Sequence, residues 1–222
     1  MVKSKKLPMA KNQAQTILSM QNDGTHVIAR NDMRQIKFRE KQKNGDIKDV
    51  KATTHISKVF WESISLLTPN DIENPKQIIS KIINIGDLVE RIGTEGHYKY
   101  VIEAARTLRA MEVMLVDEEG NEIYTGFLSN VKHVKGTGVL EIEISNSWAK
   151  YVLDIMQHNN FSFQKNYILI LQNISAVRLY PFFKSWVNKG VYDTSIERFK
   201  KDFGYDTTGY KSFFNLKDKV LD

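Results

Sequence analysis

The side chains best suited to chemistry in this sequence lie in its last fourteen positions. On a helical wheel of residues 209–222, aromatic and aliphatic side chains gather on one face and polar side chains on the other. The polar face carries Lys211, Ser212, Asn215, Asp218 and Lys219. Asparagine forms paired hydrogen bonds with adenine, lysine donates to guanine or to phosphate, and serine serves either purpose. The pattern predicts a helix that reads base edges, with Thr208 just ahead of it as a further contact, although an ordinary surface helix has the same two faces.

A second group of basic side chains falls in the middle of the chain. A helix is expected over 97–111, and its outward face carries Lys99 and Arg106, which are spaced to hold phosphates. A glutamate and an isoleucine share that face, so a protein contact fits it equally well. Lys132 and Lys135 follow on a predicted strand and its turn, where they would either press on a nucleic-acid backbone or simply be solvated.

The residue types present exclude several classes of enzyme and metal site. The chain has no cysteine, which removes thiol nucleophiles, disulfides and cysteine-based metal sites. None of its five histidines lies three or four residues from another, and no Walker-type phosphate loop occurs. Tyr98 and Tyr100 are expected to be packing aromatics rather than nucleophiles. We therefore predict no catalytic residue, no metal and no cofactor.

Positive charge is concentrated at the two ends of the chain. The 222 residues include 32 lysines and arginines against 26 aspartates and glutamates, a net charge of +6. Residues 1–51 carry +7, residues 52–150 carry −4 and residues 151–222 carry +3. Because phosphate neutralisation drives binding to nucleic acids, the ends are the better candidates for contact with a polyanion. The sequence has no long apolar run and no signal peptide, which predicts a cytoplasmic protein without a membrane-spanning helix.

Hydrophobic periodicity predicts a mixture of helices and strands. Helices are expected over 56–67, 86–92, 97–111, 148–156, 173–188, 196–203 and 209–221. Strands are expected over 112–117, 122–131 and 139–144, and the segment 161–171 fits either a strand or a helix. Two helices, a turn between them and a following β-ribbon form the order of a winged helix, and a second helix–turn–helix pattern appears near the end of the chain.

Several spaced segments together resemble one protein family. These are 134–144 followed by 148–156, then 175–180, 196–203, 210–213 and 219–222. In this order they resemble the theta-type plasmid replication initiator (Rep) proteins, which bind repeated origin sequences called iterons. The resemblance extends over about residues 55–222 and rests on several segments rather than on one short motif.

The resemblance implies an α+β protein built from two winged-helix domains. It implies that 52–157 form a first domain used for dimerisation and auxiliary DNA contact, and that 158–222 form the domain that reads DNA. The positive charge of residues 1–51 separately predicts a basic N-terminal arm ahead of them. Pro181 departs from the family, whose helix continues unbroken there, and predicts a kink. The sequence stops at Asp222, where the family continues into a strand pair, so the second domain is expected to be incomplete.

The function expected from this resemblance is initiation of plasmid replication by sequence-specific binding to double-stranded DNA at origin repeats. The expected protein partners are a second copy of the chain, in a homodimer, and host replication proteins such as a helicase or an initiator. A winged-helix transcriptional repressor would use the same helices. A nicking or joining enzyme and a simple dimerisation module are further alternatives.

Overall fold

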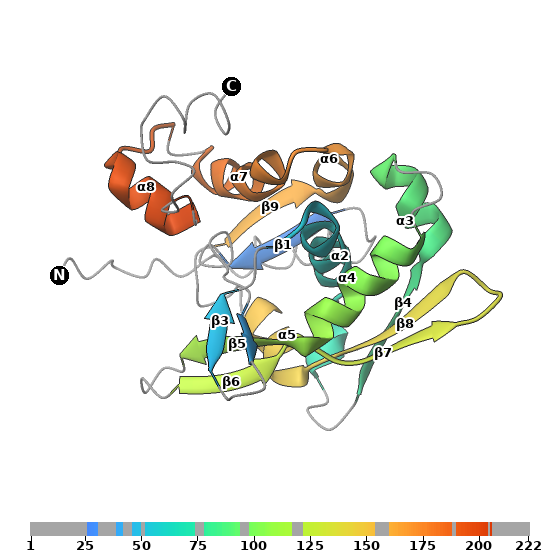
Figure 1. The fold of residues 1–222 in the computed structure, drawn as a ribbon. Helices are drawn as coiled ribbons and strands as arrows, with labels where there is room; N and C mark the ends of the chain where they lie inside the picture. The colour runs from blue at the N-terminus through green and yellow to red at the C-terminus, as the bar shows by residue number, and fades with distance from the viewer. Residues whose placement is uncertain are drawn as a thin grey trace.

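The structure, a computed structural model, describes residues 26–30, 39–41, 46–49, 52–73, 78–93, 98–116, 122–153, 160–187, 190–203 and 205. The helices are α2 (Thr54–Ser65), the short 3-10 helix η2 (Pro69–Ile72), α3 (Ile85–Ile92), α4 (Tyr98–Ala110), α5 (Asn146–Leu153), α6 (Lys165–Ile170), α7 (Ile174–Trp186) and α8 (Ile196–Phe203). The strands are β1 (His26–Arg30), β2 (Arg39–Lys41), β3 (Ile47–Asp49), β4 (Ile79–Asn84), β5 (Met111–Val116), β6 (Glu122–Gly126), β7 (Leu128–Val134), β8 (Val139–Ile144) and β9 (Asn160–Gln164). Figure 1 shows their arrangement.

A winged-helix unit forms the centre of the molecule. Its elements are, in chain order, α2, β4, α3, α4, β7 and β8, with β5 and β6 inserted between α4 and β7. Its sheet has the antiparallel order β4-β8-β7. The last strand therefore lies between the other two, with the β7–β8 hairpin as the wing (Figure 1). On β8, Leu140, Ile142 and Ile144 are buried and the alternate residues are partly exposed. The expected α+β class, the helix–turn–helix order and the alternation along β8 are confirmed.

The expected strand over 122–131 is wrong, because it is two strands in different sheets. Phe127 is fully buried at the break, where the chain leaves β6 and enters β7. β5 and β6 form a hairpin that joins β2 and β3 in a separate sheet of order β3-β2-β5-β6. The wing is thus formed by β7 and β8 alone.

Strand pairing also connects the N-terminal region with the strand that follows α5. β1 pairs antiparallel with β9, from His26 opposite Gln164 to Arg30 opposite Asn160, and Val27 belongs to the main core. The N-terminal region predicted as an arm therefore contributes strands to two sheets. The predicted boundary between residues 157 and 158 falls between α5 and β9, and β9 and α6 pack into the same core as the winged helix. The ambiguous segment 161–171 contains both structures, β9 and then α6.

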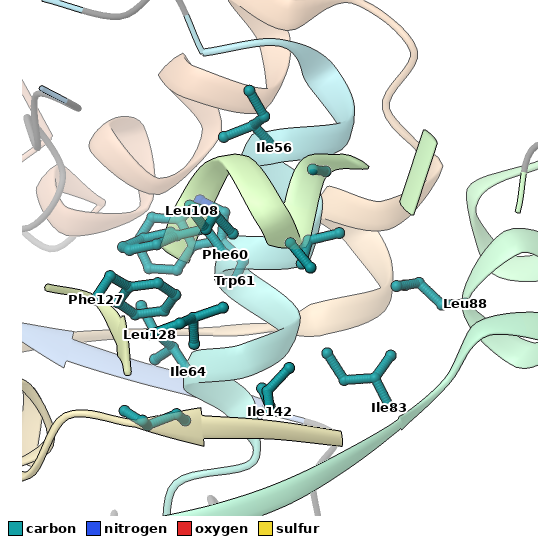
Figure 2. Packing of buried hydrophobic residues seen from close by; sticks show 14 of the residues in the cluster. Ile56, Phe60, Trp61, Ile64, Ile83, Leu88, Leu108, Phe127, Leu128 and Ile142 are labelled. Carbon is teal, nitrogen blue, oxygen red and sulfur yellow. The ribbon is translucent and has the colours of Figure 1, made fainter. Parts of the chain in front are cut away.

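The main core surrounds α2, which is buried along most of its length. Thr53 starts this helix, because its side-chain oxygen accepts a hydrogen bond from the Ile56 amide at 3.2 Å. The Phe60 ring lies 4.8 Å from the Phe127 ring, and Trp61 meets Phe163 of β9 at 5.4 Å, between ring centroids. Figure 2 shows the apolar side chains of α2 converging with those of α3, α4 and the wing sheet.

A smaller aromatic core lies at the far end of α7. It consists of Leu179, Phe182, Phe203 and Tyr205, which we call the second core. Phe182 packs against Phe203 with 4.7 Å between ring centroids. The expected helices over 173–188 and 196–203 are confirmed as α7 and α8. Pro181 lies inside α7, and the helix continues past it.

Lys58 on α2 is fully buried, and its ammonium nitrogen has no hydrogen-bond partner. Burial lowers the pKa of this lysine from 10.5 to about 8, because an apolar surrounding disfavours the charged form. Between pH 8 and 10.5 the unfolded chain therefore holds more protons than the folded chain, so stability rises with pH across this window. We expect the free energy of unfolding to increase by about 1 kcal/mol from pH 7 to pH 9, measured by urea unfolding.

Lys58→Met should remove this rise and make the protein more stable at pH 7, because no buried charge remains. Lys150→Met, at an exposed position on α5, is the matched control and should leave the pH dependence as in the wild type. An unchanged pH dependence in Lys58→Met would contradict the assignment.

Candidate nucleic-acid interface

Helices α3 and α4 form the helix–turn–helix of the winged-helix unit. The Asn84 side chain starts α3 by accepting a hydrogen bond from the Asp87 amide at 3.3 Å. Gly93 ends it in the left-handed conformation, with φ of 72°, which favours glycine. The Ile85 amide at the start of α3 donates to the Gly138 carbonyl of the wing at 2.9 Å. The helix–turn–helix and the wing are therefore held together at this point.

The outward face of α4 carries mixed charge. Lys99, Glu103, Arg106 and Arg109 are all exposed, and the opposite face of the helix is buried, as predicted. Arg106 donates to Glu103 at 3.2 Å, and both side chains are about two-thirds exposed. A pair this exposed contributes little to stability and is easily exchanged for a phosphate. Lys99 and Arg106 are therefore accessible to solvent on the outward face of α4, and their contact with a DNA backbone stays a prediction.

Arg109 is a further basic residue that the sequence analysis left out. It lies exposed near the end of α4, three positions after Arg106. This helical spacing is the signal in the sequence that would have found it, because residues three apart lie on neighbouring parts of one surface. With it, the outward face of α4 has a small excess of positive charge.

Two tyrosines at the start of α4 are more exposed than predicted. Tyr98 and Tyr100 are 46% and 43% exposed, so they are not simply packing aromatics. Tyr100 stacks on His55 with 5.3 Å between ring centroids, and the Lys99 ammonium lies 5.1 Å from the Tyr100 ring centre. The first turn of α4 thus presents a cation supported by an aromatic ring.

The wing presents Lys132 and Lys135 to solvent. Lys132 on β7 donates to Glu141 on β8 at 2.8 Å, as the strand register places these two residues opposite each other. Lys135 lies at the tip, in a turn where Gly136 and Gly138 both have positive φ. A Cβ added at either position would meet no other atom. Glycine is therefore favoured at both positions by the positive φ alone and not by lack of space. Lys132 is partly neutralised and Lys135 is not.

We expect Lys135→Ala to weaken DNA binding a few-fold and to reduce the salt dependence of binding by about one phosphate contact, independently of sequence. Glu141→Gln should have the opposite effect, because it releases Lys132 for a phosphate. Fluorescence anisotropy over a range of salt concentrations measures both. A Lys135→Ala protein with wild-type affinity and salt slope would show that the wing stays away from DNA.

Five of the predicted contact residues lie outside the described residues. They are Thr208, Lys211, Ser212, Asn215 and Lys219. The helix expected over 209–221 also lies there, so its role stays a prediction. Among the residues that are described, His, Asp and Glu side chains form no group that could hold a metal ion. In that same part of the chain, no helix is long and apolar enough to cross a membrane.

Comparison with known proteins places this architecture in a family. The model of the initiator replication protein family, WH1 domain, matches residues 26–184, which is more than half of the chain. The crystal structure of Pi initiator protein in complex with iteron DNA has a similar fold, with a TM-score of 0.63 and 14% sequence identity. The match covers 90% of this chain and 84% of that one. No curated protein matches the sequence. The chain belongs to the family of initiator replication proteins, and the winged-helix unit of α2 to β8 lies within the region that defines it.

Proposed function

We propose that this protein initiates plasmid replication by binding double-stranded DNA at repeated origin sequences. It acts through binding energy without a chemical step: phosphate contacts fix its position and a recognition helix reads bases. It works in the cytoplasm, opens neighbouring duplex and recruits host replication proteins, such as a helicase or an initiator. The main reading surface is the polar face of residues 209–222, and α4 with the wing supplies backbone contacts through Lys99, Arg106, Lys132 and Lys135.

The observation that carries this proposal is the winged-helix unit in a chain of the initiator family. Its order, its sheet topology and the basic residues on α4 and at the wing tip are the elements with which winged helices meet DNA. The similar fold of an initiator solved with iteron DNA supports the same conclusion.

Footprinting on the DNA around the coding region tests the proposal. Protection of several direct repeats is expected of an initiator, and protection of a single palindrome near a promoter would favour a repressor instead. Incubation with supercoiled origin DNA and a divalent metal ion should leave the DNA supercoiled. Relaxed or nicked DNA would contradict the proposal that the protein acts by binding without a chemical step.

We further propose that the protein forms a homodimer through the wing sheet. Among the described strands, β4 lies at the edge of its sheet. Ile82 on this strand and Ile78 just before it are 65% and 66% exposed. Exposed apolar side chains on an edge strand favour pairing with another strand. Ile82→Lys should therefore shift the protein toward monomer in analytical ultracentrifugation. Ser80→Lys, at the same edge, is a second disruptive variant, and Glu90→Lys on α3 is the control that should leave the dimer unchanged.

A further inference from the structure

Helix α7 is shared by the two cores. Val177 in its first half is fully buried in the main core, and Tyr180 packs there against Phe163 of β9 with 5.5 Å between ring centroids. Leu179 and Phe182 belong to the second core. One helix therefore carries side chains of both cores, so its position fixes where the second core lies relative to the first.

The segment leading into α7 is attached to the helix–turn–helix by two polar contacts. The Gln172 side-chain amide donates to the Ile92 carbonyl at the end of α3, at 2.9 Å. On α6, the buried ammonium of Lys165 donates to Glu62 of α2 at 3.0 Å. The same Glu62 oxygen accepts from Arg91 of α3 at 3.3 Å. α3 is thus connected to α6 through a shared carboxylate and to the α6–α7 connection directly.

Pro181 lies in α7 between Tyr180, which packs against the main core, and Phe182 of the second core, and Leu179 of the second core precedes both. Pro181 has no amide hydrogen, so the Val177 carbonyl lacks its usual helical partner and the helix bends most easily here. The backbone hydrogen bonds of α7 therefore constrain the direction of its second half, which carries Phe182, less than those of an unbroken helix would. Contacts made before the proline, including those of Leu179 with the second core and those that hold the start of α7, therefore add to that constraint.

We propose that Lys165 and Gln172 are positioning residues that set the orientation of the second core relative to the helix–turn–helix of α3 and α4. They hold α6 and the start of α7 against α3, and α7 carries this orientation to α8. Two DNA-contacting units held at a fixed angle meet their subsites together, which raises the affinity for a complete site. This last consequence rests on the proposed function, and the orientation itself does not.

Because the chain has no cysteine, spin labels attach only at cysteines introduced for the purpose, and the orientation of the second core can be measured in the full chain. Glu90→Cys on α3 and Glu197→Cys on α8 are exposed positions for a pair of spin labels. Double electron–electron resonance without DNA should give one narrow distance distribution. Gln172→Ala and Lys165→Met should each broaden it or shift it, and together they should do so more strongly. Asn166→Ala, exposed on α6, is the matched control and should leave the distribution unchanged.

A distribution that is broad in the parent protein, or unchanged in both variants, would overturn the proposal. Gln172→Ala leaves the buried ion pair intact, so it keeps the test valid if Lys165→Met lowers stability, which circular dichroism reports. With DNA, Gln172→Ala should weaken binding to a complete origin repeat roughly tenfold. A parent protein that binds no DNA but has the narrow distribution contradicts the proposed function and leaves the orientation proposal standing.

Discussion

Replacing Lys211, Asn215 and Lys219 together with alanine should reduce the affinity for an origin repeat at least about 100-fold, because each lost base or phosphate contact costs about 1–3 kcal/mol. These residues share the polar face that the sequence predicts for 209–222. Affinity for unrelated DNA should fall much less, since other basic residues still contact phosphates. Competition titrations with specific and random duplexes measure the ratio of the two affinities.

Asp218→Ala is the matched control for this prediction. Asp218 lies on the same predicted face, and its negative charge opposes DNA, so its removal should preserve or raise affinity. Asn215→Ala alone should relax the preference at one base position, while Lys219→Ala should weaken all sequences alike. If the triple variant keeps full preference for the origin repeat, base reading belongs to another surface, and α4 becomes the first candidate.

The local structure of the helix–turn–helix could be predicted from the sequence because its signals are local. Gly93 ends α3 where a left-handed residue is needed, and the apolar spacing of α4 gives its buried face directly. The exposure of Lys99 and Arg106 follows from the same spacing. Alternation along β8 likewise depends only on neighbours in the sequence.

The sheet partners could not be predicted in this way. β1 and β9 are separated by well over 100 residues, and no local pattern shows that they pair. The break at Phe127 could not be predicted because a single residue separates β6 from β7, although the two strands join different sheets. Only the tertiary packing that buries Phe127 separates them.

The candidate nucleic-acid interface could likewise be predicted only as far as local sequence signals reach. Basic residues could be found by type, but their neutralisation depends on which residue lies opposite. Lys132 faces Glu141 only because of the β7–β8 register, and the bulge near Leu128 alters that register. The Arg106–Glu103 pair, three residues apart on one helix, follows from spacing alone.

Glu62→Ala should lower the free energy of unfolding by about 3–5 kcal/mol, the usual cost of leaving a buried charge unpaired. Glu62 and Lys165 are 5% and 7% exposed, and the carboxylate also accepts from Arg91. Its removal leaves the Lys165 ammonium inside the protein without a partner. Urea unfolding at pH 7, followed by circular dichroism, measures the loss.

Glu103→Ala provides the comparison, since it removes an ion pair with Arg106 that solvent already screens. That variant should cost less than about 1 kcal/mol. The double variant Glu62→Ala with Lys165→Met should be more stable than Glu62→Ala alone, because methionine fills the same space without a charge. If Glu62→Ala and Glu103→Ala lower the free energy of unfolding by the same amount, water reaches the Lys165 ammonium in the Glu62→Ala protein. A double variant no more stable than Glu62→Ala would mean that the lost packing of the glutamate, and not the stranded ammonium, accounts for the cost.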